Sequence, residues 1–131
     1  MPHHLKKLTP NIIVADVSRS IAFYRDVLGF TLDQTVPDAE PFVFAIVKSG
    51  DVQIYLNAPG PAHEEYPAFK GRPFGGTLTL FIEVENIRAS YDQLKERVQV
   101  VMPLETKWYG VTEFAFLDLD GYIITFAEPG S

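Results

Sequence analysis

The side chains that could carry chemistry form few close groups in this sequence. His63, Glu64 and Glu65 stand together and could form an acid–base pair or part of a metal site, but no further ligand accompanies them. A solvated surface is therefore the favoured interpretation of this trio. His3 and His4 lie beside the N-terminus, where side chains are commonly incidental. The chain has no cysteine, which excludes disulfides, thiolate metal sites and a cysteine nucleophile.

The better candidates for ligand contact lie in the last quarter of the chain. Trp108 and Tyr109 precede Gly110, and their rings are suited to stacking on a flat molecule or holding a cation. Packing in the core or against a second subunit is an equal alternative. If Phe114 points into the core, Glu113 turns the other way, where a carboxylate can pair with a ligand cation or act as a base. A rim glutamate exposed to water is a slightly favoured alternative.

Composition excludes several function classes. The chain has 131 residues with 17 acidic and 11 basic side chains, a formal net charge of −6, and its basic residues are scattered. A nucleic-acid partner is not expected, because it needs a clustered cationic surface. The acidity mildly favours a neutral or cationic ligand, although solubility alone explains it more simply. No stretch reaches transmembrane length and no secretory signal is visible, so we expect one cytoplasmic domain over residues 1–131 without a membrane partner.

An internal repeat organises the chain. The segment "NIIVADVSRSIAFYRDVLGF" and the segment "TLFIEVENIRASYDQLKERV" share a layout at an offset of 70 residues, as do "FVFAI" with "TEFAF" and "DVQIYL" with "GYIITF". Asp16 or Ser18 is the predicted N-cap of the first helix, which ends at Gly29, and Asn86 is the predicted N-cap of the second.

Each half reads as strand, helix, strand, strand, strand. The predicted strands are 8–15, 30–36, 41–48 and 51–57, then 77–85, 98–103, 111–117 and 121–127, with helices at 18–28 and 86–97. Tight hairpin turns are expected at 48–51 and 118–121. The modules thus span 8–57 and 77–128, and the Pro- and Gly-rich connector 58–76 is predicted to be a loop that acts as a lid, a subunit contact or a plain linker.

Strand parity separates two faces. The apolar face is expected to pack under the helices and comprises Pro10, Ile12, Val14, Val52, Ile54, Leu56, Leu78, Leu80, Ile82, Tyr122, Ile124 and Phe126. The opposite face is uncharged and comprises Thr9, Asn11, Ile13, Gln53, Tyr55, Asn57, Thr77, Thr79, Phe81, Ile123, Thr125 and Ala127. Such a mixed face suits a concave small-molecule site, or equally a second buried interface such as a dimer contact. Phe42 and Phe44 fit the core better than a site.

The two modules resemble the vicinal oxygen chelate superfamily, most clearly in the segments "DVSRSIAFYRDVLGF" and "FAFLDLDGYIITFAEP". This superfamily includes glyoxalase I, extradiol dioxygenases, fosfomycin-modifying enzymes and bleomycin-binding resistance proteins. The resemblance covers roughly residues 8–128, with Leu119 in place of the usual proline and Tyr122 in place of the common asparagine. It implies an α+β fold in which two tandem βαβββ modules form a curved mixed-sheet cup with the helices on its outer face.

The resemblance also implies where a metal would be held. In metal-dependent members, the first and last strands of each module present His, Glu or Gln, and the matching positions here are Thr9, Tyr55, Thr79 and Thr125. Neutral hydroxyls rarely hold Zn²⁺, Ni²⁺ or Fe²⁺ without imidazole or carboxylate beside them. We therefore expect no metal and no other cofactor at the cup.

Within the superfamily, the bleomycin-resistance-type binding proteins are the most similar. The early proline (Pro10) and "KWYGVTEFAFLDLDGY" match their pattern, with Tyr109 as one extra residue. This implies a homodimer with grooves between subunits, and N-terminal strand exchange near Pro10. We expect a metal-free protein that sequesters an aromatic or cationic ligand, as in drug resistance, using Tyr55, Thr79, Phe81, Trp108, Tyr109, Glu113 and Thr125, with no catalytic residue.

Two other function classes stay open at this point. One is an enzyme, either a glyoxalase-type lyase or isomerase or a dioxygenase-related protein, with a non-standard site. The other is a structural or regulatory partner whose cup is filled by protein. Fold alone does not decide between them.

Overall fold

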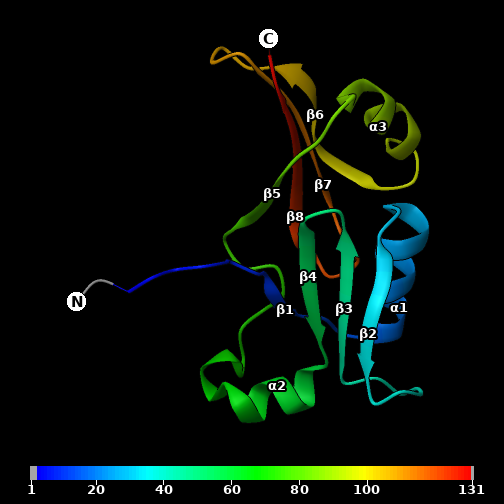
Figure 1. Cartoon of the computed structure of the whole chain (residues 1–131), viewed down its shortest axis with the longest axis vertical. Coiled ribbons are helices and arrows are strands. Elements are labelled where there is room, and N and C mark those ends of the chain that lie inside the picture. The colour runs from blue at the N-terminus through cyan, green and yellow to red at the C-terminus, as the bar shows by residue number, and fades with distance from the viewer. Residues whose placement is uncertain (1–2, 131) are drawn as a thin grey trace.

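Two four-stranded mixed sheets with the same strand order form the frame of the molecule (Figure 1). The neighbours in the first sheet are, in order, β1 (Asn11–Ile13), β4 (Val52–Asn57), β3 (Phe44–Ser49) and β2 (Thr31–Val36). In the second sheet they are β5 (Thr79–Glu83), β8 (Ile123–Pro129), β7 (Val111–Leu117) and β6 (Gln99–Thr106). The edge strands β1 and β5 pair in parallel and the other pairs are antiparallel. This computed structural model describes residues 3–130, and it confirms the predicted α+β fold of two repeated modules.

The helices α1 (Val17–Ala22) and α3 (Ile87–Leu94) lie on one side of the strands, on the right in Figure 1. A π-helical turn at Phe23–Val27 extends α1. The segment ends at Gly29, as predicted, because its φ of 81° is left-handed and glycine adopts it without a Cβ clash. The amide of Phe30 then donates to the carbonyl of Tyr24 at 2.9 Å, which closes the helix end.

The two main helices are capped in different ways. Asp16 is the N-cap of α1, and its Oδ1 accepts from the amide of Arg19 at 3.1 Å, which confirms one of the two predicted caps. Asn86 is the N-cap residue of α3, as predicted, but it is left-handed (φ 55°) and its side chain makes no capping bond. Instead the carboxylate of Glu128 on β8 accepts from the amides of Asn86 and Ile87 at 2.9 and 3.0 Å. These bonds lower the pKa of Glu128.

One continuous hydrophobic core lies between the sheets and the helices. It contains residues of both modules, including Tyr24, Leu56, Phe114, Phe116 and Ile124, all nearly inaccessible to water. Most of the predicted apolar face therefore packs under the helices, since strand residues two apart share a side. Leu78 was predicted to belong to this face, which is wrong. It precedes β5 and its side chain is 51% exposed.

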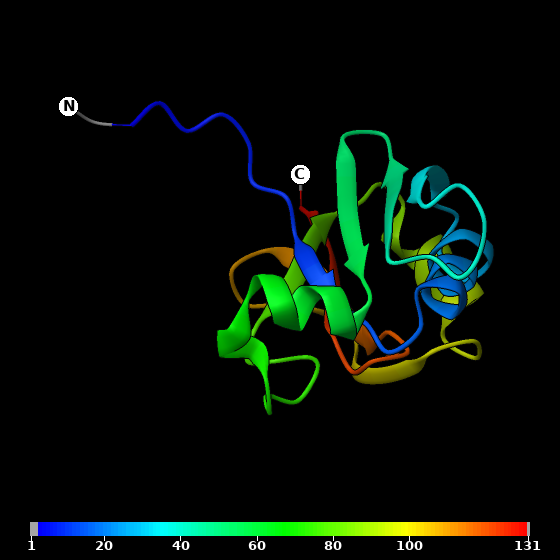
Figure 2. The ribbon, with the colours of Figure 1, turned by 90° about the horizontal axis from the view of Figure 1, so that it is seen from below.

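The connector is more ordered than the predicted loop. It contains α2 (Pro59–Glu65) and a 3₁₀ turn at Pro67–Phe69, and α2 lies beside β1 (Figure 2). The Pro- and Gly-rich sequence suggested a loop, but proline is well accommodated in the first turn of a helix, where its missing N–H has no partner to lose.

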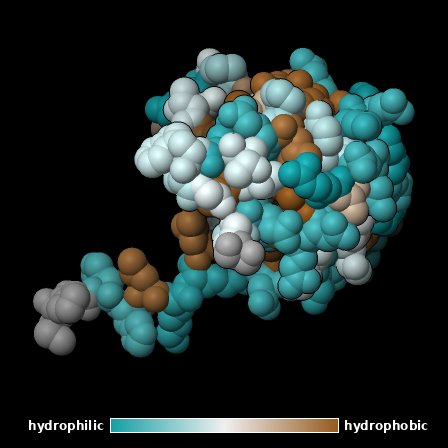
Figure 3. All heavy atoms as spheres, turned by 90° about the horizontal axis from the view of Figure 1, so that it is seen from above, coloured by the Kyte–Doolittle hydropathy of each residue, from teal (hydrophilic) through white to brown (hydrophobic). Residues whose placement is uncertain are grey.

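The N-terminal segment stands away from the body, as Figures 1 to 3 show. The predicted strand 8–15 is too long, since β1 covers only Asn11–Ile13. Leu5 and Leu8 are 87% and 94% exposed. No helix within the described range 3–130 has the length and apolar character needed to cross a membrane.

Candidate functional site

A groove of about 660 Å³ runs between the N-terminal segment, the start of β4 and the edge strand β5. Residues 7–10, 51–54 and 78–83 line it. Two of the predicted ligand contacts, Thr79 and Phe81, are among them. The groove therefore lies along the edge at which the second sheet ends.

Strand register places two further predicted contacts, Thr125 and Glu113, on the same face of the second sheet. Phe81 is opposite Thr125, which in turn is opposite Ala115 on β7. Glu113, two residues before Ala115, therefore points to this side as predicted, while Phe114 points into the core. We call the side that bears Thr79, Phe81, Glu113, Ala115 and Thr125 the cup face.

Two hydroxyls on the cup face are bonded to each other. Thr79 Oγ1 donates to the carbonyl of Ile123 at 3.2 Å and lies 2.6 Å from Thr125 Oγ1. Because a hydroxyl has a single hydrogen, Thr125 is the donor within this pair. Thr125 is 5% exposed, so it supports Thr79, whereas the exposed Phe81 and Thr79 are the groups that reach the groove.

The donor set does not fit a divalent metal. The four family positions are Thr9, Tyr55, Thr79 and Thr125, all with neutral hydroxyls. Thr9 and Thr79 line the groove, but Tyr55 lies on the first sheet. Within residues 3–130, no three His, Asp or Glu side chains come close enough together to hold a metal ion. We therefore derive no metal-dependent step.

The aromatic pair lies at the tip of the β6–β7 hairpin. Trp108 is 95% exposed and Tyr109 is 51% exposed, so packing of either ring in this chain's core is ruled out. Their rings meet edge to face, with centroids 5.3 Å apart and an interplanar angle of 88°. The amide of Gly110 donates to the carbonyl of Lys107 at 2.9 Å and closes the tip. The open face of Trp108 is free for stacking or for a subunit contact.

Glu113 is buried beneath this tip. It is 5% exposed, so the alternative of a water-exposed rim glutamate is wrong. The phenol of Tyr109 donates to Glu113 Oε2 at 2.7 Å, and this bond to a carboxylate raises the pKa of Tyr109. The tyrosine thus both covers the carboxylate and supplies its hydrogen-bond donor.

The cup face is more acidic than predicted. Glu83, Ala127, Glu113 and Glu105 succeed one another in register across β5, β8, β7 and β6. Lys7 and Asp51 also line the groove, and Lys7 donates to Gln53. The prediction of an uncharged face is therefore wrong. Glu83 follows Phe81 by two residues, so extending the parity analysis by one step would have found it.

Tyr55 is set apart from the other predicted contacts. It is half-buried on the first sheet and meets Phe44 edge to face at 5.3 Å. The core assignment of Phe44 is wrong, because its register on β3 puts it on the side of Tyr55, away from the core cluster, whereas Phe42 does pack against the core. Glu64 and Glu65 are exposed as predicted, but His63 is half-buried.

Comparisons with known proteins agree with this architecture. The model of the Glyoxalase/Bleomycin resistance protein/Dioxygenase superfamily matches residues 2–126. A bleomycin resistance protein of Geobacillus stearothermophilus is 30% identical over 129 residues, covering 91% of this chain and 93% of the relative, and the Staphylococcus aureus protein of that name matches equally.

Solved structures give the same picture. A superfamily member from Sphaerobacter thermophilus has a TM-score of 0.77 at 26% identity, over 95% of this chain and 98% of the other. TnmS3, an antibiotic binding protein from Streptomyces, has a TM-score of 0.70 at 22% identity, over 98% of both chains, and so shares the fold.

Proposed function

The chain belongs to the glyoxalase/bleomycin resistance protein/dioxygenase superfamily, and on that premise we propose that it sequesters a small aromatic or cationic molecule without a metal ion. One observation carries the proposal: the exposed Trp108–Tyr109 tip lies directly over the buried carboxylate of Glu113. The relatives named for bleomycin resistance support a role in binding a small molecule.

The proposed mechanism uses the tip as a clamp. Trp108 stacks on a flat part of the ligand, since its ring is the most exposed aromatic surface on the described part of the chain. A ligand cation near Glu113 gains a partly desolvated carboxylate, with Glu105 and Glu83 extending the negative charge along the same row. Thr79 offers a hydroxyl at the groove edge. Sequestration needs only tight binding, and none of these groups has to react.

We further propose that the site is completed in a homodimer. Phe81 is 59% and Leu78 51% exposed beside the groove, and Leu8 on the projecting N-terminal segment is 94% exposed. Apolar surface that gathers in this way commonly marks an interaction site. A second copy, with exchange of the segment before Pro10, would cover these side chains and close the groove around a ligand.

Intrinsic fluorescence tests the proposal, because Trp108 is the only tryptophan in the chain. Titration with metal-free bleomycin, and with a planar monocation such as ethidium as a second probe, should change Trp108 emission and saturate. Calorimetry should show that Trp108→Ala weakens binding about tenfold, the scale of stacking plus a cation–π contact. Tyr66→Ala, which removes an exposed aromatic on the connector, should leave affinity unchanged.

Three outcomes would contradict this function. If Trp108→Ala binds the ligand with the same affinity as the parent, the proposed stacking by Trp108 is wrong. If sedimentation shows only monomer at working concentration, the proposed site between two subunits is wrong. The enzyme alternative would be established by two results together. The protein, purified without chelator, would carry one tightly held divalent metal per chain, and it would show a glyoxalase-type activity that depends on this metal.

A further inference from the structure

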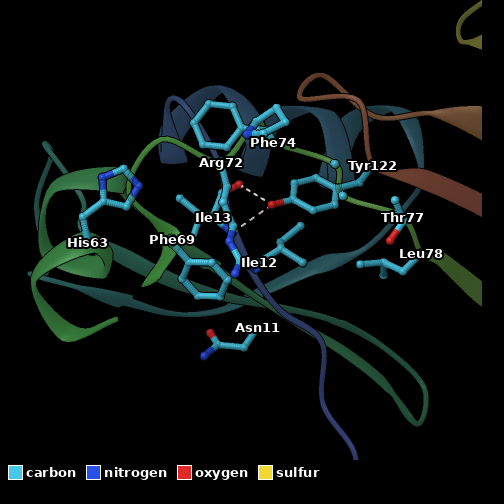
Figure 4. A pocket seen from close by; sticks show the side chains of 13 residues that line it. Asn11, Ile12, Ile13, His63, Phe69, Arg72, Phe74, Thr77, Leu78 and Tyr122 are labelled. Atoms are coloured by element: carbon cyan, nitrogen blue, oxygen red, sulfur yellow. Dashed lines mark hydrogen bonds between the residues drawn. The ribbon is translucent and has the colours of Figure 1, made fainter. Parts of the chain in front are cut away.

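A second pocket, of about 300 Å³, lies between β1 and the connector (Figure 4). The connector contributes His63, Phe69 and residues 72–76, and the strand contributes Asn11, Ile12 and Ile13. We call it the connector pocket. It shares only Leu78 with the groove of the cup face, so the two are separate sites.

The walls of the connector pocket are mainly apolar. The rings of Phe69, Phe74 and Tyr122 surround the hollow together with Ile13 (Figure 4). Phe69 and Phe74 are 37% and 39% exposed, which leaves apolar area for a ligand to cover. The volume is at the lower end of the range for ligand pockets and suits one or two fused rings.

The charge of this pocket is opposite to that of the molecule. Arg72 is the charged residue of its lining, His63 lies in the same wall, and none of the described residues that line it is acidic. The chain as a whole has a formal net charge of −6. Arg72 forms no ion pair with any residue in the range 3–130. Its guanidinium is therefore available to a ligand.

The pocket is also firmly built. The phenol of Tyr122 donates to the carbonyl of Ile13 at 2.7 Å and accepts from the amide of the same residue at 3.2 Å, which fixes the ring in the floor. The connector is held close by: a Cβ on Gly75 would lie 2.7 Å from the carbonyl oxygen of Gly121. A ligand therefore meets a preformed floor at Tyr122 and Gly75, and its binding does not have to order these residues.

From these observations we propose that the connector pocket binds an apolar molecule with a single carboxylate, such as an aromatic carboxylate. The rings enclose the apolar body, and the guanidinium of Arg72 pairs with the carboxylate, for which its planar fork of donors is well matched. The imidazole of His63 offers a further hydrogen bond from α2. This inference is independent of the function proposed for the cup face, whose ligand is aromatic or cationic.

A pair of matched probes tests it. 1-Naphthoate carries the carboxylate, and 1-naphthamide is a neutral molecule of nearly the same shape. In a titration followed by amide chemical shifts, 1-naphthoate should move the signals of Gly75, Gly76 and Thr77 and saturate. It should bind about fivefold or more tighter than 1-naphthamide, the scale of a charge-assisted bond at a partly exposed site.

Variants test whether Arg72 and Phe69 are responsible for binding these probes. Arg72→Gln should abolish the preference for 1-naphthoate, while Arg88→Gln, which removes an exposed arginine of α3 outside the pocket lining, should preserve it. Phe69→Ala should weaken both probes. Because all three side chains are surface-exposed, the variants should keep the fold.

Other outcomes would overturn the proposal. The proposed contact between Arg72 and the carboxylate is wrong if the two probes bind with equal affinity. It is also wrong if Arg72→Gln and Arg88→Gln show the same preference for 1-naphthoate. Shifts confined to Thr79, Phe81 and Tyr109 place the binding at the cup face. An absence of saturable shifts at residues 75–77 shows that the pocket does not bind this class of molecule.

Discussion

The two hairpin turns at 48–51 and 118–121 occupy the same place in the repeat but differ in their surroundings. The first turn joins β3 to β4, and all four of its residues are exposed. Its Lys48 pairs with Asp33 of the same sheet at 3.2 Å. Asp51 lines the groove of the cup face.

The second turn joins β7 to β8 and is bonded to the first module. Asp118 is 7% exposed and accepts from the amides of Asp120 and Tyr122 at 2.9 Å each, and from the phenol of Tyr24 at 2.8 Å. Asp120 accepts from the amide of Ala15 at 2.9 Å and from the hydroxyl of Ser20 at 3.3 Å. Burial raises the pKa of Asp118, against the opposing effect of these bonds.

The difference shows that a repeated backbone does not imply repeated contacts. Both turns use a left-handed glycine, Gly50 with φ of 57° and Gly121 with φ of 88°. Only the second carries a buried carboxylate, that of Asp118, and together with the half-buried Asp120 it holds the two modules together. The first is left free beside the groove, where a ligand or a second subunit can use it.

The strongest test of this contrast compares Asp118 with Lys48, which stands 70 residues earlier at the equivalent position. Asp118→Ala leaves the buried phenol of Tyr24 and two amides without their acceptor, so we expect the free energy of unfolding to fall by about 3 kcal/mol. Lys48→Ala removes an exposed ion pair and should cost less than about 0.5 kcal/mol. Urea denaturation measures both, and equal losses would refute the contrast.

Asp120 provides a smaller test, because its equivalent in the first turn is Gly50 and has no side chain. Asp120→Ala removes two acceptor contacts to the first module, at Ala15 and Ser20, and should cost about 1 to 2 kcal/mol in urea denaturation. Ser20→Ala keeps the contact to the Ala15 amide and should cost less. A larger loss in Ser20→Ala would mean that the small buried serine matters for packing and that Asp120 does not join the modules.

The pH dependence of stability offers a third test. Burial, and then the charge of Asp118, raise the pKa of Tyr24 in the folded protein, whereas the unfolded phenol ionises near pH 10. The contribution of this protonated phenol is complete below about pH 10 and is lost as the pH rises above it. Between pH 9 and pH 11 the parent should therefore lose about 1 kcal/mol more than Tyr24→Phe. If the free energies of unfolding of the parent and of Tyr24→Phe change equally with pH across this range, the bond from Tyr24 to Asp118 does not make this contribution.

The helix caps provide the smallest test. The first module caps α1 with its own Asp16, whereas α3 depends on Glu128. Glu128→Gln should lower the melting temperature by about 2 to 5 °C at neutral pH. Since the folded-state pKa of Glu128 is lowered, its contribution is present above about pH 4 and is lost as the pH falls through the folded value. The difference between the parent and Glu128→Gln should shrink in acid, and a constant difference would argue against a charged cap.

The repeat was enough to predict the order of the strands, the two main helices and most of the apolar face, because periodicity and turn residues are local signals. What it missed depends on distant partners. Glu128 caps a helix 41 residues before it, and Asp118 bonds a tyrosine 94 residues before it. Neither residue looks unusual in its own segment. The face of Glu113 follows from strand parity, but its cover by Tyr109 depends on how the hairpin tip folds over. The ligand role of these residues stays a prediction.

The hydrogen bonds from the second turn also affect how the protein folds while it is being synthesised. A ribosome releases the first module before residues 118–122 exist, so Ser20 and Tyr24 leave the tunnel without the acceptors that they later use, 100 and 94 residues further along the chain. The newly made N-terminal half therefore has a hydroxyl and a phenol with no permanent partner. Its final closure has to wait for contacts that are very distant in sequence, and such contacts slow folding. During that interval chaperones and proteases have access to a half-finished molecule.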